Sequence, residues 1–442
     1  MSKRLAGLGG FALSFLLLAG CTGGGTGDDP AKDGEKVTLR MINWANPAAN
    51  AVIEEINKKF TEANPDIVVD YQVAANTSTS YATLLQTAVA SSSVDIITTN
   101  NPFQPLPDNP TRDNMSQEQM WATSGVLMPL TDQPWLANYT DSARASMTYE
   151  GEVYGVLSGV YQWMVFYDKD VFAAHGLSEP KTYTEFITIM DTLKAAGVQP
   201  LWLGAGGGAE IYVRNFLSAP LMNSVWAPKA GSGGLAKALE RGDLSWDDPA
   251  FITILDKLSE VGGYLQPGWT GTSWQGMPGD FAAGRSAMLL DGSWDLSAVR
   301  EANPSMNIGS FPLPGSDNAA DNQPILVQDL TFAILKDAKN KDAAVKYLEF
   351  FSQPENYSQY VNATGISPSQ SAGEYSSFAS EVLGERFGQG TPSSDVLPLL
   401  SPLSTTYCQT PENFAKVLIE VMEGKKTSKD AAALFTESCH IE

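Results

Sequence analysis

The chain has 442 residues, with 50 Asp or Glu against 28 Lys or Arg, so its net charge is −22. A surface this acidic repels nucleic acid and anionic lipid, and we expect neither as a partner. Only three cysteines and two histidines are present, which excludes a Cys/His metal site, and we expect no cofactor.

The first 36 residues predict export and attachment to a membrane. Residues 1–20 combine a basic start with an uncharged apolar stretch, the pattern of a signal peptide. They end at Leu18-Ala-Gly-Cys21, and small residues before a cysteine resemble the lipidation site of bacterial lipoproteins. Residues 21–36 are polar and Gly-rich, as in a flexible tether. We expect Cys21 to be lipidated and to hold the protein on the outer face of the cell membrane; ordinary secretion with Cys21 as a core thiol is the alternative.

Two cysteines remain in the folded part, Cys408 and Cys439. An even pair in an oxidising compartment predicts one disulfide. Two separate buried thiols are the alternative.

Residues 37–99 alternate between strand and helix patterns. Apolar β-rich runs and helical spacings predict strands over 37–44, 66–73 and 94–99, with helices over 52–64 and 81–89. This β-α-β-α-β order predicts a parallel sheet covered by helices. A Pro, Asp and Asn-rich stretch at 103–119 predicts an inserted surface loop.

The alternation resumes after residue 149. We expect a strand over 152–167, a helix that begins at Thr182 with a Thr182/Glu185 capping box, and a strand over 199–203. Later helices are predicted from Asp248-Pro249 onward and near 343–351, 414–422 and 430–436. About 400 folded residues exceed what one core organises, so the chain predicts two α/β domains.

The sequence contains partial patterns of three kinds of catalytic or cofactor site. The glycine run 204–209 follows a strand as in dinucleotide-binding folds, but no acidic residue follows about 20 positions on, so we interpret the glycines as a tight turn at a cleft wall. His175 ends a predicted helix and His440 lies near the chain end, and neither has the setting of a catalytic base. A carboxylate pair for glycoside hydrolysis remains possible because such a pair is spatial rather than sequential.

Ten tryptophans are present, several beside Gly, Pro or Asn near predicted element ends. The tryptophans near predicted element ends are Trp44, Trp163, Trp202, Trp226, Trp269, Trp274 and Trp294. Ligand crevices of open parallel sheets lie at the carboxyl ends of strands, and flat aromatic faces there stack on sugar rings. For each tryptophan taken alone, core filling is the alternative.

One segment resembles a known family closely. Residues 281–294, Phe-Ala-Ala-Gly-Arg-Ser-Ala-Met-Leu-Leu-Asp-Gly-Ser-Trp, are similar to the helix-Gly-x-x-Ala-Met-strand-Gly-x-Trp segment of the family 1 extracellular solute-binding proteins, the maltose-binding-protein type. Further matches occur in order at 125–131, 149–155, 166–170, 180–186, 347–351 and 424–431. The resemblance therefore spans nearly the whole mature chain.

The resemblance implies an α/β fold with two lobes, a hinge and a ligand cleft between them. It places residues 37–157 plus 328–362 in an N-terminal lobe and 158–327 plus 363–442 in a C-terminal lobe. Strands that cross between the lobes are expected near 155–160, 327–330 and 361–365. It further implies a monomer that captures an oligosaccharide and delivers it to ABC transporter permease subunits without being an enzyme.

The resemblance also suggests site residues. Trp294 occupies the position of a sugar-stacking tryptophan, and Glu210 with Tyr212 resembles a ligand-contacting Glu-x-Tyr pair. Further expected contacts are Trp44, Asn46, Asn100, Tyr161, Trp163 and Asp329. Tyr161 replaces an acid of the family, which argues against assuming maltose as the ligand. A secreted glycoside hydrolase and a non-transport glycan-binding or sensing lipoprotein remain the alternative functions.

Overall fold

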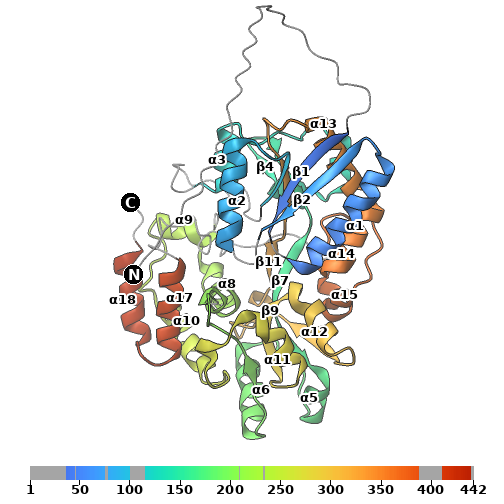
Figure 1. Ribbon diagram of the computed structural model, residues 1–442. Helices are drawn as coiled ribbons and strands as arrows, with labels where there is room; N and C mark the ends of the chain where they lie inside the picture. Colours follow the sequence, from blue (N-terminus) through green and yellow to red (C-terminus); the bar gives the residue numbers. More distant parts are fainter. Residues whose placement is uncertain are drawn as a thin grey trace, which may run out of the picture. The chain divides into compact units, whose positions relative to one another are not determined.

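The structure is a computed structural model that describes residues 36–44, 46–74, 78–99, 115–208, 210–231, 234–387 and 411–439 (Figure 1). Within these ranges it contains two five-stranded sheets and one two-stranded sheet. The signal peptide, the lipidation residue Cys21, Asn100 and Cys408 lie outside the described residues. No helix of the described part is both long and apolar enough to cross a membrane.

The first sheet contains the first three strands of the chain in parallel. Its order is β2 (Ile67–Val73), β1 (Val37–Asn43), β3 (Ile96–Thr99), β12 (Thr331–Ile334) and β6 (Val156–Leu157). Strand β12 is antiparallel to both β3 and β6. Helices α1 (Pro47–Ala63) and α2 (Ser78–Ser91) connect the parallel strands. The predicted β-α-β-α-β order is therefore confirmed.

Helix α1 forms because its apolar residues recur on one face. The residues that this spacing buries, at most 4 % exposed, are Val52, Ile53, Ile56 and Phe60. Asn46 caps the helix by accepting a hydrogen bond from the Ala49 N–H at 3.2 Å. The helix ends at Asn64, directly before Pro65, where the preceding residue is biased away from helical dihedrals.

The second sheet is built around one long strand. Strand β7 (Val160–Asp168) is paired with β10 (Ile308–Phe311), β11 (Ile325–Gln328) and β9 (Met288–Gly292), all antiparallel to it. Strand β8 (Leu201–Trp202) adds to β9 in parallel. The carboxyl ends of β8 and β9 thus lie at the same edge.

The single strand expected over 152–167 was wrong in its extent. The structure divides it into β5 (Glu152–Val153), which pairs with β4 (Thr148–Tyr149), then β6 and β7. Glycines stand at both breaks. A Cβ added at Gly155 would lie 2.5 Å from Thr331 Cγ2, and one at Gly159 would lie 2.5 Å from Ile366 Cδ1. The chain bends where only glycine lets neighbouring segments approach this closely.

The chain passes between the two sheets at residues 158–159 and again at 329–330. The two passages run side by side, because Ser158 N–H donates to Leu330 O and Asp329 N–H donates to Gly159 O, both at 2.9 Å. The third crossing strand, expected near 361–365, is not a strand. Helix α14 (Pro354–Thr364) occupies this segment and ends at Gly365, whose φ of +70° is left-handed.

The remaining helices agree in part with the sequence patterns. Those predicted and found are α6 (Tyr183–Ala195), α10 (Pro249–Gly262), α13 (Lys341–Phe351), α17 (Pro411–Met422) and α18 (Ser428–Ser438). The Thr182/Glu185 capping box is present. Part of the loop expected at 103–119 is instead α3 (Gln117–Thr123), which begins at a Ser116/Gln119 capping box. Helices α14 and α15 (Phe378–Leu383) were missed.

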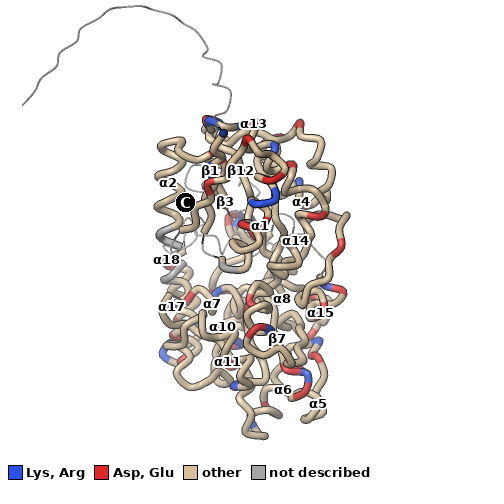
Figure 2. The backbone as a smooth tube through the Cα atoms, turned by 45° about the vertical axis from the view of Figure 1, so that its right-hand side comes forward, with Lys and Arg blue, Asp and Glu red and all other residues tan. Residues whose placement is uncertain are grey.

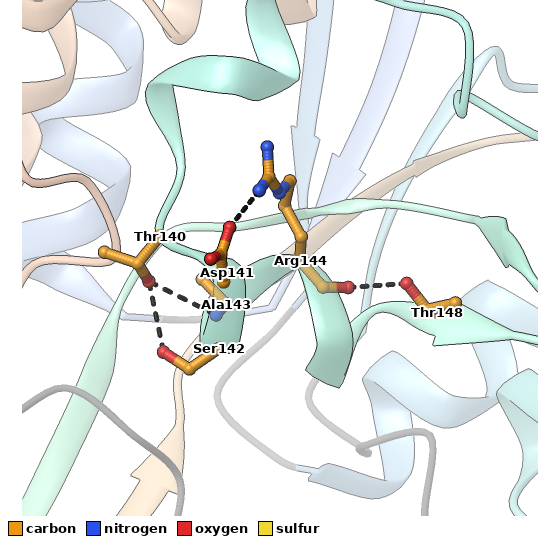
Figure 3. A network of polar contacts seen from close by, with 6 residues as sticks. All are labelled: Thr140, Asp141, Ser142, Ala143, Arg144 and Thr148. Atoms are coloured by element: carbon orange, nitrogen blue, oxygen red, sulfur yellow. Dashed lines mark hydrogen bonds and ion pairs between the residues drawn. The ribbon is translucent and has the colours of Figure 1, made fainter.

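Short helices fill the connections, among them α5 (Lys169–Ala174), α11 (Met277–Ala282), α12 (Leu296–Ala302) and α4 (Asp141–Ser146). Figure 3 shows how α4 is held at both ends. Thr140 accepts from the Ala143 N–H at 3.2 Å, and the Arg144 guanidinium pairs with Asp141. Thr148 then closes the last turn by donating to Arg144 O at 2.8 Å. His175 ends α5, as the sequence indicated.

Two large clusters of buried apolar side chains stabilise the fold. The first is centred on β1, β3, α1, α13 and α14, and the second on β8, α6, α10, α17 and α18. Charged residues lie mainly on the helices and the turns that join them (Figure 2). Cys439 ends α18 and is disulfide-bonded, while its predicted partner, Cys408, lies outside the described residues.

Candidate functional site

Trp294 lies at the carboxyl end of β9, where the strand gives way to the turn η6 (Ser293–Asp295) and then to α12. Its side chain is partly exposed and packs against both hydrophobic clusters. The ring folds back over Gly292, where an added Cβ would overlap it. The Gly-x-Trp spacing is thus a steric requirement: the glycine leaves the space that the indole occupies.

An aromatic cluster surrounds Trp294. Its ring is edge-on to Tyr161 of β7, with centroids 4.8 Å apart, and lies 5.9 Å from Phe216. Phe216 also contacts Trp163 at 5.5 Å and Tyr212 at 4.8 Å. Four residues predicted from the sequence, Trp294, Tyr161, Trp163 and Tyr212, are therefore brought together. Phe216, which contacts three of the four, was missed, although its spacing of four residues from Tyr212 on a helix is a usable signal.

A π-helical turn positions two members of this cluster. Helix α7 (Glu210–Tyr212) leads into the π-helical segment η2 (Val213–Ser218) and then into α8 (Ala219–Val225). Such turns are rare and recur at functional sites. Tyr212 in α7 also stacks on Trp274, with centroids 6.1 Å apart and planes 20° from parallel. Glu210, the other half of the predicted pair, is partly exposed and forms no hydrogen bond or ion pair within the described ranges.

The glycine run at 204–208 lies beside this cluster. A Cβ added at Gly204 would overlap the Thr272 carbonyl, and one at Gly206 would lie 2.5 Å from Gly271. Gly206 also forms a β-bridge with Ser273. The glycines let the segment that carries Trp274 pack directly on the end of β8, which fits the tight turn predicted for them.

Not every tryptophan near an element end belongs to the cluster. Trp226 is fully buried, with ring centroids 5.2 Å from Trp246 and 5.0 Å from Phe251. Trp269 is 8 % exposed, and no ring contact joins it to the aromatic cluster within the described residues. For these two, the core-filling alternative describes the structure better.

Two carboxyl groups lie next to Trp294, and the sequence did not single them out. Asp291 is fully buried and accepts a hydrogen bond from the Gly292 N–H at 2.8 Å. The Trp294 Nε1–H donates to Asp295 Oδ2 at 3.1 Å. The charge of Asp295 raises the pKa of Asp291, so the two carboxyl groups lie close together. Two neighbouring carboxyl groups can hydrogen-bond to each other only if one of them holds a proton.

Burial sets the ionisation of this pair. Burial, with the neighbouring charge of Asp295, holds the pKa of Asp291 well above its usual range. Burial raises the pKa of Asp295 to about 6, against the opposing effect of its hydrogen bonds to Asp291 and Trp294. Burial and the charges of both carboxylates also raise the pKa of Tyr212, which places its ring close to the pair.

Asp329 lies at the passage between the two sheets and is 1 % exposed. Its Oδ2 accepts hydrogen bonds from Ser158 Oγ at 2.6 Å and Tyr360 OH at 2.9 Å, and its Oδ1 accepts one from the Tyr161 hydroxyl. Burial raises the pKa of Asp329, and these three hydroxyls oppose the rise. A carboxylate engaged by three protein donors favours a structural role at the crossing over a direct ligand contact.

The residues expected from the N-terminal lobe divide into three cases. The Asn46 side chain opposes the rise in the pKa of the Tyr161 hydroxyl, so the N-cap residue of α1 lies near the aromatic cluster on β7. Trp44 is partly buried and lies edge-on to Tyr81, with centroids 6.1 Å apart. Asn100 lies outside the described residues.

Comparison with known proteins identifies the family. The family model of the bacterial extracellular solute-binding proteins matches residues 44–358, more than half of the chain. The chain belongs to this family. The resemblance drawn from residues 281–294 is therefore confirmed.

Relatives of this solute-binding protein are distant. A multiple sugar-binding protein of Streptococcus mutans is 23 % identical over 82 % of this chain and 81 % of its own length. A maltooligosaccharide ABC transporter solute-binding lipoprotein of Streptococcus pneumoniae is 21 % identical over 97 % of this chain and 95 % of its own.

Solved structures support the fold. The solute-binding protein RafE in complex with raffinose has a TM-score of 0.69 at 21 % identity, covering 91 % of this chain and 99 % of that one. A sugar transporter of Bacillus licheniformis in complex with stachyose has a TM-score of 0.66 at 18 % identity, covering 91 % and 98 %. The predicted two-lobed, periplasmic-binding-protein-like α/β fold is thereby confirmed.

Proposed function

We propose that this solute-binding protein captures an oligosaccharide outside the cell and delivers it, unchanged, to the permease of an ABC importer. The aromatic cluster around Trp294 carries the proposal. Its rings come from β7, from the end of β9 and from the helical segment beside them. Trp294 and Tyr212 are partly exposed, and their faces, with carboxyl and hydroxyl groups nearby, suit sugar rings. The sugar ligands in the names of its relatives and structural neighbours support the same ligand class.

Each residue has a role in this proposal. Trp294 stacks on a sugar ring, and Tyr212 with Trp163 and Tyr161 forms the wall around it. Glu210, which forms no bond or ion pair in the part of the chain described, accepts hydrogen bonds from sugar hydroxyls. Trp44, Asn46 and Asn100 supply contacts from the opposite lobe.

Closure of the lobes encloses the sugar. The lobes comprise 37–157 with 328–362, and 158–327 with 363–442. Asp329 acts at the hinge, because its three hydroxyl partners come from β7, α14 and the neighbouring passage of the chain. Hinge closure of this kind is the usual way in which periplasmic binding proteins enclose a ligand.

Thermal unfolding with a sugar panel tests the ligand class. Raffinose, stachyose, maltotriose and a chitin oligosaccharide are each added to the mature protein, and one of them should raise its melting temperature. A ligand present at about 100 times its Kd adds about 2.7 kcal/mol to the free energy of unfolding. An unchanged melting temperature with every neutral oligosaccharide tried would contradict the proposal.

Chromatography of the same mixtures tests the claim that the sugar is not converted. The proposal requires that no glycosidic bond is broken when the sugar binds. The bound sugar should therefore be recovered intact. Cleavage products that disappear in a carboxylate variant would identify a hydrolase instead.

Cell fractionation tests the lipid anchor on Cys21. We propose that Cys21→Ser releases the protein from the membrane and leaves sugar binding intact, because the Gly-rich segment 21–36 separates the anchor from the folded part. A Cys21→Ser protein as firmly membrane-bound as the parent would contradict the lipidation. Loss of sugar uptake on deletion of the cognate permease genes would distinguish transport from adhesion or sensing.

A further inference from the structure

The Trp294 ring is held on four sides by protein groups. Gly292 lies under it, and the rings of Tyr161 and Phe216 lie against it. Three of these contacts are apolar and tolerate sliding of the ring. The fourth is directional: the indole N–H donates to Asp295 Oδ2 at 3.1 Å. Rotation of the indole about its side-chain bonds breaks that bond, so Asp295 fixes the angle at which the ring is presented.

Asp295 is itself held by Asp291. Asp291 is rigid, because it is the penultimate residue of β9, is fully buried and accepts from the Gly292 N–H at 2.8 Å. Its Oδ2 is buried and has no hydrogen-bond partner among the described residues. The charge of the neighbouring Asp295 raises the pKa of Asp291, and a proton held between the two carboxyl groups gives this oxygen a partner. A proton on Asp291 therefore leaves the negative charge on Asp295, where the Trp294 N–H needs an acceptor.

We propose that Asp295 is a positioning residue for Trp294, that Asp291 holds it in place through a shared proton, and that the pair makes the orientation of the ring depend on pH. The part of this inference that concerns sugar affinity rests on the proposed function. The part that concerns the ring does not.

The elements packed against the Asp291–Asp295 pair carry several other charged and titratable groups. They are Tyr161, Tyr167 and Asp168 on β7, Tyr212 on α7, Arg214 in η2, Asp280 on α11, and Arg300 and Glu301 on α12. Tyr161 and Tyr212 feel the charge of the pair directly. Arg214 donates from Nε to Asn215, Asp280 pairs with Arg285, and Arg300 lies 3.7 Å from the centre of the Phe378 ring. Neither Asp291 nor Asp295 takes part in an ion pair within the described ranges.

The direction of the pH effect follows from the ionisation of Asp295, which accepts the hydrogen bond of the Trp294 indole. Burial raises the pKa of Asp295 to about 6, so the carboxylate is ionised at neutral pH and becomes protonated as the solution is acidified. A neutral carboxylic acid is a weaker acceptor than a carboxylate. The indole bond then weakens, and the ring is less well fixed below about pH 6 than above it.

Nuclear magnetic resonance of the sugar-free mature protein tests the ring directly. The indole N–H signals of nitrogen-15-labelled tryptophan are followed from about pH 4.5 to about pH 8, and Trp294→Phe assigns the relevant signal. We expect the Trp294 signal to shift with a midpoint near 6. Asp295→Asn should abolish the shift, and Asp291→Asn should move the midpoint to lower pH, because the new amide donates permanently to Asp295. Glu301→Gln, an exposed acid on α12, is the matched control and should titrate like the parent.

A Trp294 signal that stays constant across this range in the parent protein would overturn the inference, and this measurement needs no variant beyond the assignment. An unchanged titration in Asp295→Asn would overturn it as well. The second arm measures affinity for the panel sugar that raises the melting temperature. We expect binding about fivefold weaker below the midpoint than above it, and independent of pH in Asp295→Asn. If no panel sugar binds but the indole signal titrates as described, the proposed function fails and the positioning role stands.

Discussion

The ring of Tyr161 meets the edge of Trp294 at a centroid distance of 4.8 Å and an interplanar angle of 78°. The same tyrosine donates its hydroxyl hydrogen bond to Asp329 at the passage between the sheets. Tyr161 therefore links the tryptophan expected to stack on the sugar with the segment expected to bend on closure. In the proposed function, one side chain would connect the ligand contact with the hinge and so couple lobe closure to the site.

Replacement of Trp294 separates a ligand-stacking residue from a core residue. Trp294→Ala should weaken sugar binding by ~2 kcal/mol or more, roughly 30-fold in Kd, as expected for a buried aromatic contact. The loss of stability should stay below ~3 kcal/mol, because the side chain is partly exposed without ligand. Calorimetric titration and thermal unfolding of the same variant measure both effects.

Trp226→Ala is the matched control for that experiment. Trp226 is fully buried against Trp246 and Phe251, so its loss should cost ~3–5 kcal/mol of stability and leave sugar affinity unchanged. If Trp294→Ala instead gave parental affinity with a strongly lowered melting temperature, Trp294 would belong to the core.

Asp329→Asn tests the hinge network. The carboxylate accepts three hydroxyl hydrogen bonds, and an amide has only one oxygen, so at least one buried hydroxyl loses its acceptor. We expect a loss of ~2–3 kcal/mol in the free energy of unfolding, measured by urea denaturation. Tyr360→Phe removes one of the three bonds and should cost only ~1 kcal/mol. Were Asp329 a direct sugar contact, Asp329→Asn would weaken binding while unfolding stayed close to that of the parent.

The sequence could predict those parts of the site that depend on short spacings. The Gly292-Ser-Trp294 segment identified the tryptophan because the glycine that makes room for its ring lies only two residues earlier in the chain. The partners of Asp329 could not be found in this way, since Ser158, Tyr161 and Tyr360 are far apart in the chain.

The sequence did not indicate that Asp291 and Asp295 lie close together, for a different reason. They are only four residues apart, but a strand, a turn and the start of a helix lie between them, so neither strand nor helix periodicity relates their side chains. The fold was easier to predict because its strands and helices are long enough to repeat their pattern. It was harder where polar or aromatic residues replaced aliphatic ones, as in α14, whose buried face includes Tyr357 and Tyr360.

The disulfide makes a prediction about thiols. Cys439 is disulfide-bonded and 5 % exposed, and we expect Cys408 to be its partner. Mature protein with Cys21→Ser should then show no titratable thiol under denaturing, non-reducing conditions. Cys408→Ala and Cys439→Ala should each leave one free thiol and lower stability equally, by ~3 kcal/mol for a loop of about 30 residues. Two titratable thiols in the unreduced Cys21→Ser protein would rule out this pairing.

The buried acid pair predicts how stability changes with pH. Burial raises the pKa of both Asp291 and Asp295 above the ordinary aspartate value, so the folded protein binds more protons than the unfolded chain at intermediate pH. Stability contributed by such groups is greatest below the unfolded pKa and is lost as the pH rises toward the folded pKa. Asp291→Asn removes this loss. Its amide can still accept from Gly292 N–H through Oδ1 and donate to Asp295 through Nδ2.

The melting temperature of Asp291→Asn relative to the parent should therefore rise with pH. We expect near equality at about pH 4 and an advantage of ~1–3 kcal/mol for the variant at about pH 7, where the parent holds a buried proton against its ordinary ionisation. Taking the difference between the two proteins cancels the contribution of the other acidic residues, which is needed in a chain with a net charge of −22. Glu301→Gln repeats the charge change at an exposed position of α12 and should give a difference that varies little with pH. A variant that is less stable than the parent at neutral pH would mean that Asp291 is ionised and favourably solvated in the folded protein, contrary to its burial.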